Sequence, residues 1–135
     1  MSKIKRLAKK TWKNKWSREL ITLSNYIKYM IGPCSFCYDA SSRRYKKEGD
    51  MTNRLAVPRI CCFCLLPKYI CYHQLGGKNL INIIHKSIIF SNTKRFYEAI
   101  NYVKICIKSL AKKGKIEGKI SKDIKLYINN YFGEN

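Results

Sequence analysis

Two Cys-x-x-Cys pairs, Cys34–Cys37 and Cys61–Cys64, constrain this 135-residue chain more than any other feature. Two thiolates at positions i and i+3 can bind one ion across a tight turn, and four thiolates complete the tetrahedral coordination that structural zinc prefers. The 23 residues between the pairs make this spacing slightly longer than is usual for a zinc module with two such turns. We therefore expect these four cysteines to hold one structural zinc ion.

Three residues near the second pair could replace one of these ligands, namely Cys62, Cys71 and His73. We favour a simpler interpretation, in which Cys71 packs as a small apolar side chain and His73 is solvated. Two other uses of the thiols stay open. An iron–sulfur cluster also takes four thiolates, although the compact ferredoxin spacing is absent. Redox Cys-x-x-Cys motifs usually occur singly, next to a strand and a helix.

The charge balance indicates a polyanionic partner. The chain holds 28 Lys and Arg residues against 8 Asp and Glu residues, a formal net charge of +20. Solubility needs a net charge of only about 2 to 8. The excess therefore favours DNA, RNA or an acidic membrane surface.

Three clusters of cations are the candidate contacts to nucleic acid. Lysine outnumbers arginine, which favours point contacts to the phosphate backbone over bidentate readout of bases. Aromatic residues stand among or near the cations (Trp12, Trp16, Tyr45 and Tyr69), a combination that suits unpaired bases or RNA. The candidate residues are Lys3, Lys5, Arg6, Lys9, Lys10, Lys13 and Lys15, then Arg43, Arg44, Lys46 and Lys47, then Lys112 and Lys113.

Hydrophobic periodicity predicts a mainly α-helical chain with a small irregular or β-hairpin insertion that binds zinc, a small α+β fold. The expected hairpin pairs residues 54–60 with residues 65–72. All parts are expected to belong to one domain. They are a basic arm or short amphipathic helix at 1–15, a helix at 16–31, a Cys-rich zinc-binding module at 32–77, and a three-helix array at 78–135.

The three C-terminal helices have recognisable limits. Apolar residues recur at helical spacing from residue 80 to about 90, and again from Phe96 to Leu110. Two lysines and Gly114 should end the second of these helices. We expect Ser121 to cap the last helix, and Gly133 to end it. Cys106 falls on the apolar face of the middle helix and is expected in the core, and His85 is expected to be an ordinary helix histidine.

The two cysteine pairs resemble the metal-binding turns of zinc-ribbon and treble-clef modules. The resemblance spans about 40 residues and concerns the module only. Such modules commonly bind nucleic acid or dock onto proteins, and the resemblance implies no narrower function.

Three functional hypotheses follow. The first is a basic zinc protein that binds DNA or RNA mainly through phosphates, of viral, phage or mobile-element origin or associated with a ribosome. The second is a protein-docking module, such as a viral inhibitor that occupies an acidic surface of a partner protein. The third, which we favour least, is binding to an anionic membrane through residues 3–16.

The sequence favours neither catalysis nor secretion. The eight carboxylates are scattered, and no small-molecule substrate is indicated. A metal-bracketed nuclease needs a wider spacing than His73, Asn79 and His85 offer. Seven cysteines without a secretory signal favour a reducing compartment, so we expect an intracellular protein of the cytoplasm, nucleus or nucleoid that does not span a membrane.

Overall fold

The chain is mainly helical, as the periodicity predicts. The structure is a computed structural model, and it describes residues 2–17, 22–24, 34–48, 61–71 and 77–133. Within these ranges it holds five helices and no strand. The helices are α1 (Lys3–Asn14), α3 (Ser35–Glu48), α5 (Leu80–Ile89), α6 (Thr93–Lys113) and α7 (Gly118–Gly133).

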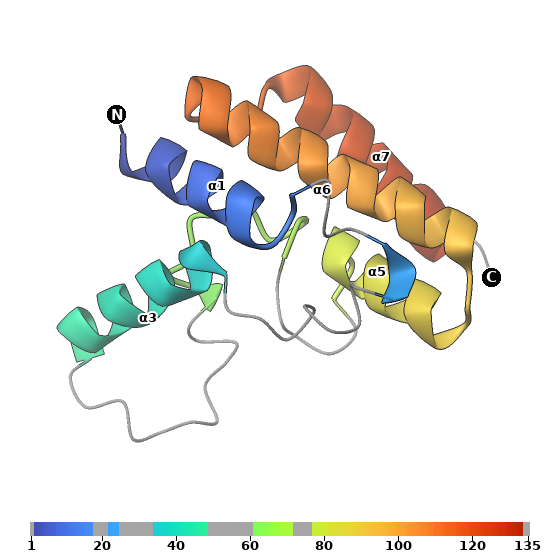
Figure 1. The fold of residues 1–135 in the computed structure, drawn as a ribbon, viewed down its shortest axis with the longest axis horizontal. Coiled ribbons are helices and arrows are strands. Elements are labelled where there is room, and N and C mark those ends of the chain that lie inside the picture. Colours follow the sequence, from blue (N-terminus) through green and yellow to red (C-terminus); the bar gives the residue numbers. More distant parts are fainter. Residues whose placement is uncertain (1, 18–21, 25–33, 49–60, 72–76, 134–135) are drawn as a thin grey trace.

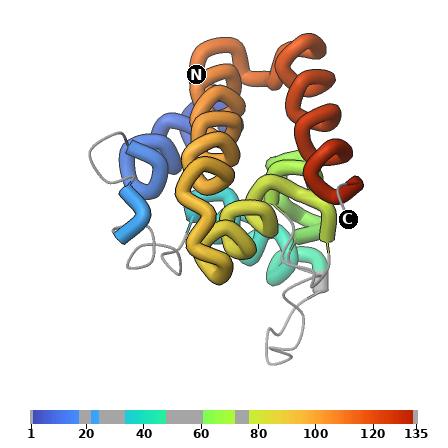
Figure 2. Tube along the Cα trace, turned by 90° about the vertical axis from the view of Figure 1, so that its right-hand side faces the viewer, coloured from blue at the N-terminus to red at the C-terminus, as the bar shows by residue number. Residues whose placement is uncertain are grey.

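Helix α6 is the centre of the arrangement. Helices α1, α5 and α7 all pack against α6, and Figure 2 shows α6 between α1 and α7. Its length of 21 residues is set by two signals. At the start, the Asn92 side chain accepts a hydrogen bond of 3.1 Å from the N–H of Arg95. At the end, Gly114 adopts a φ of 76°, which glycine accepts without steric cost, and donates its N–H to the carbonyl of Leu110.

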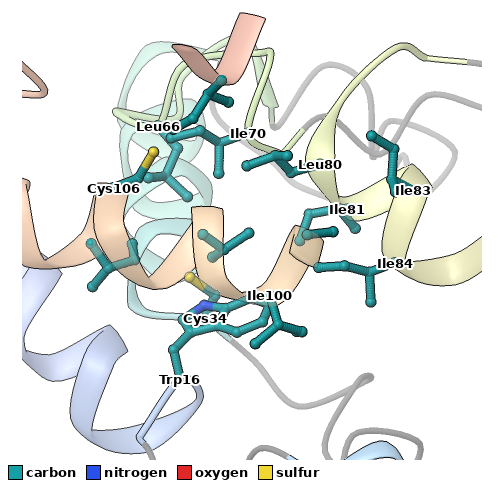
Figure 3. Close-up of a cluster of buried hydrophobic side chains, with 14 of the residues drawn as sticks. Trp16, Cys34, Leu66, Ile70, Leu80, Ile81, Ile83, Ile84, Ile100 and Cys106 are labelled. Atoms are coloured by element: carbon teal, nitrogen blue, oxygen red, sulfur yellow. The ribbon is translucent and has the colours of Figure 1, made fainter. Parts of the chain in front are cut away.

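The buried face of α6 carries most of the core. Its apolar residues recur at spacings of three and four and are all buried, from Phe96 through Ile100 and Ile107 to Leu110. Cys106 is fully buried among them, which confirms its expected place in the core. Four buried apolar residues of α5 and two of α7 join the same cluster. Figure 3 shows part of this cluster, in which side chains of α5 and α6 meet Trp16 and Cys34.

Residues 3–14, for which the sequence left an arm or a helix open, form helix α1. Ser2 caps the helix by accepting a hydrogen bond from the N–H of Lys5. Ala8 and Thr11 are buried, and α1 lies antiparallel to α6. Lys5 lies beside Gly114 at the end of α6, while Lys108, almost two turns earlier in α6, stands over the Trp12 ring. The basic segment is therefore part of the packed structure (Figure 1).

Other expectations need correction or lie outside the described residues. The last helix begins at Gly118, so Ser121 is inside it and does not cap it; its N–H already donates to the carbonyl of Glu117. Residues 65–71 form turns and not the second strand of the expected hairpin. The other strand, 54–60, lies outside the described residues. So does most of the helix expected at 16–31, where residues 16 and 17 are not helical.

Truncation of a central core side chain should test this packing. Ile107 is completely buried on α6, so Ile107→Ala should lower the free energy of unfolding by about 2–5 kcal/mol through lost burial and a new cavity. The matched control is Leu126→Ala on α7, because that side chain is 59% exposed and should change stability by less than about 0.5 kcal/mol. Denaturant unfolding of both variants measures the difference, and equal losses would contradict the packing.

Candidate functional site

The first cysteine pair lies at the start of α3. The N–H of Cys37 donates to the carbonyl of Cys34 at 2.9 Å, and the N–H of Tyr38 donates to the same carbonyl at 3.1 Å. These bonds close the first turn of the helix directly after Cys34. The Cys34 side chain is buried, and its sulfur lies 3.6 Å from the hydroxyl oxygen of Thr11 on α1. Packing of α1 on α3 therefore determines the surroundings of this thiol.

The second pair forms a turn of the same kind. The N–H of Cys64 donates to the carbonyl of Cys61 at 3.2 Å, and the N–H of Leu66 donates to the Cys64 sulfur at 3.4 Å. Backbone N–H donors of this kind favour a thiolate over a thiol. The turn is attached to the helices by hydrogen bonds from α5, in which Leu80 donates to the carbonyl of Tyr69 and Ile81 to that of Ile70.

The sulfur atoms of the two pairs influence one another. A hydrogen bond from Cys37 lowers the pKa of the Cys34 thiol to about 6, and Thr11 and the Phe36 N–H act in the same direction. The Cys37 thiol donates its proton in this hydrogen bond, and the bond therefore raises the pKa of Cys37. Burial is the main cause that raises the pKa of Cys64 to about 11. The negative charge of Cys34 adds to this effect.

Cys71 belongs to the same group of thiols. Burial raises the pKa of its thiol to about 12, and the nearby charges of Cys34 and Cys64 act in the same direction. Cys34 is a member of the hydrophobic core, while Cys37, Cys64 and Cys71 pack against it. Cys71 was expected to pack as an apolar residue, and it is half-buried against the hydrophobic core. Cys62 is exposed, and His73 lies outside the described residues.

The donor chemistry of this group suits zinc, but the geometry is not that of a closed site. Thiolates are the preferred ligands of structural zinc, and both pairs have the required i to i+3 turn. Among the residues that the structure describes, no three Cys, His, Asp or Glu side chains are grouped as ligands of one ion. The described geometry thus contains two turns packed against one core, and joining them at one ion remains a prediction.

A strongly basic face covers the outer side of α1. Its members are Arg6, Lys9, Lys10 and Lys13, which are all exposed. Arg6 stands three residues before Lys9 and four before Lys10, and Lys13 stands four residues after Lys9 and three after Lys10. Residues with these spacings are neighbours on a helix surface. Helix α1 contains no Asp or Glu, and none of the four cations forms an ion pair with a residue in the described ranges. We call these four residues the α1 basic face.

The other candidate cations have more varied surroundings. Asp39 is a buried carboxylate that forms two ion pairs, from Oδ1 to Lys3 Nζ at 2.7 Å and from Oδ2 to Arg43 Nε at 3.1 Å. Arg44 is only 4% exposed, so it is poorly placed for a phosphate. Lys15 stands over the Trp16 ring, Lys47 over the Phe63 ring, and Lys113 pairs with Glu117. Lys46 and Lys112 are exposed, and Lys5 is half-buried.

The fold brings the three sequence clusters together around the start of α1. Lys3 forms an ion pair with Asp39 of α3, and Lys5 lies beside the glycine that ends α6. In consequence, the first turn of α1 lies between the α3 cations and the lysines at the end of α6, as Figure 1 shows. These clusters are far apart in the sequence, and only the tertiary structure makes them neighbours.

Sequence reasoning missed Asp39, Thr11 and Tyr38. Asp39 had a usable signal, since it stands four residues before Arg43, the helical spacing of an ion pair. Thr11 had none, because it lies 23 residues from Cys34 in the sequence. Tyr38 is 65% exposed on α3, but the sequence gave no reason to separate it from the other aromatic residues.

No family model, curated protein or solved structure matches this chain. No helix within the described ranges is both long and apolar enough to cross a membrane.

Changing Thr11 should alter the titration of Cys34. Thr11→Val keeps the shape of the side chain but removes one hydrogen-bond donor to the Cys34 sulfur, so the pKa of Cys34 should rise from about 6. Thr11→Ser keeps the hydroxyl and should preserve the low pKa. NMR of isotope-labelled cysteine in the metal-free protein can follow the titration. An unchanged pKa in Thr11→Val would show that Thr11 has no effect on this thiol.

Proposed function

We propose that this chain binds nucleic acid through phosphate contacts of the α1 basic face. One observation carries the proposal, namely four exposed cations on adjacent turns of a helix that has no acidic residue. Like charges at these spacings repel one another, which weakens the helix when no counter-charge is present. A polyanion relieves this repulsion, and nucleic acid supplies negative charges at a regular and close spacing.

Folding prepares the α1 basic face for this contact. The four residues span seven helical steps, about 10 Å along the axis, on a helix that is fixed to α6 through Ala8 and its apolar neighbours. Because the helix is already formed, binding does not have to order a free arm. Neutralised phosphates release their condensed cations, so most of the affinity should depend on salt concentration. Exposed Lys112 at the end of α6 extends the positive surface.

We further propose that Cys34, Cys37, Cys61 and Cys64 hold one structural zinc ion. Support comes from the matching turns of the two pairs, the N–H donors to the sulfurs of Cys34 and Cys64, and the common core beneath them. Bound zinc would supply a covalent-strength cross-link between α3 and residues 61–71. Because Asp39 of α3 forms an ion pair with Lys3 of α1, the zinc cross-link would also help to hold α1 and its basic face in place.

Removing the four charges of the α1 basic face should change the salt dependence of binding. We expect Arg6→Gln, Lys9→Gln, Lys10→Gln and Lys13→Gln together to reduce the slope of log K against log salt by about three to four for duplex DNA, since each phosphate contact contributes about 0.9. Fluorescence anisotropy over a salt series measures this slope.

A matched control removes the same charge elsewhere. The variant carries Lys78→Gln, Lys94→Gln, Lys119→Gln and Lys122→Gln, all at exposed positions outside α1. Its slope should fall by less than about one. Equal losses in both variants would mean that binding is diffuse and that α1 has no special role, and no binding by the unmodified protein would refute the proposed function.

Loss of two cysteines should remove the metal and destabilise the fold. The protein purified with zinc should contain one ion per chain by native mass and elemental analysis, and Cys61→Ser with Cys64→Ser should contain none, because two thiolates hold zinc far less well than four. Cys106→Ala is the matched control, since this buried cysteine belongs to α6 and should leave the zinc content unchanged. Iron, or no metal in the unmodified protein, would contradict the zinc proposal.

A further inference from the structure

We infer that Tyr38 and Tyr45 on α3 stack on unpaired bases, so that the nucleic acid bound by this chain is single-stranded DNA or RNA. The inference rests on the function proposed above and specifies its ligand. Tyr38 is 65% exposed and Tyr45 is 58% exposed. They stand seven residues apart, two helical turns, and therefore share one face of α3.

These two rings differ from the other aromatic residues near the cations. The Trp12 ring is covered by Lys108 at 5.0 Å, and the Tyr69 ring by Lys125 at 5.1 Å. Trp16 is buried and meets Lys15. Neither α3 tyrosine has a ring or cation contact with any residue in the described part of the chain. Of the four aromatic residues that the sequence singled out, only Tyr45 is exposed and has no cation over its ring among the described residues.

The surroundings of the two rings favour a nucleic acid over a protein. Ser42, which stands between them on this face, is small and exposed. Lys46, the residue after Tyr45, is exposed and can meet a phosphate. At the other end, Asp39 links α3 to Lys3, three residues before the first member of the α1 basic face. A strand whose bases contact α3 would therefore have cations along its backbone on both sides.

Duplex DNA does not fit this arrangement. The two rings are about 10 Å apart along α3, whereas successive base pairs of a duplex are about 3.4 Å apart and stack on each other. Aromatic side chains reach the faces of bases only where the strand is unpaired and extended. The α1 basic face can contact the phosphates of either form, so the tyrosines would determine the preference for single strands.

The test compares nucleic acids of equal length with and without accessible bases. The probes are oligo(dT), oligo(U), an abasic DNA strand and a duplex, each of about 16 nucleotides. Tyr38→Ala with Tyr45→Ala should weaken binding of oligo(dT) or oligo(U), or both, by at least about thirtyfold, since the loss of each of the two stacked bases should cost at least about fivefold. Binding of the abasic strand and the duplex should stay the same. Tyr38→Phe with Tyr45→Phe keeps both rings and should retain full affinity.

The controls separate this inference from the function on which it rests. Phe90→Ala removes an aromatic ring that is 75% exposed in the turn between α5 and α6, and it should not change binding. If the alanine double variant binds every probe as the unmodified protein does, stacking is refuted while phosphate binding stands. Equal losses for all four probes would also refute stacking. If the unmodified protein binds none of the probes, both proposals fail.

Discussion

The antiparallel contact of α1 with α6 is the constraint on which the rest of the structure depends. A 12-residue helix is marginal on its own in water, and α1 carries like charges at neighbouring positions that oppose its formation. Burial of Ala8 and Thr11, with Ile4, Leu7 and Trp12 packed around them, offsets that repulsion. The same contact places Thr11 against Cys34 and directs the cations away from the core. One side of α1 therefore contacts Cys34, and another side carries the α1 basic face.

Because carboxylates are scarce in this chain, one carboxylate pairs with several cations, and other cations lie over aromatic rings. Eight Asp and Glu residues cannot pair with 28 cations. Asp39 is buried and meets cations from both α1 and α3, so a single carboxylate joins two helices. Several other cations lie over aromatic rings, as Lys108 does over Trp12, a contact that is favourable without a formal counter-charge. The cations of the α1 basic face have neither kind of contact within the described residues, and they are the ones that we propose to bind phosphates.

Local signals predicted much of the helical part and little of the site. The limits of α5 and α6 follow from side-chain caps at Asn79 and Asn92 and from Gly114, all within a few residues of the ends they define. Ser121 shows the limit of that reasoning, because a residue with good capping chemistry can lie inside a helix that packing extends. Local sequence could not show whether residues 3–14 form an arm or a helix, because the helix is stabilised by packing against α6, about 100 residues away in the sequence. The sequence also provided no means to predict that Thr11 lies beside Cys34, or that the three basic clusters lie close together, because both depend on tertiary contacts.

Amide hydrogen exchange over α1 tests the central claim most directly. If α1 is a helix fixed to α6 in the free protein, the amides of residues 7–14 should be protected to a degree comparable with the middle of α6, without any nucleic acid present. Addition of nucleic acid should then change their protection little. Complete exchange of these amides at the earliest time, with protection only after nucleic acid is added, would show that the segment is a free arm that orders on binding, and it would contradict a basic face prepared by folding.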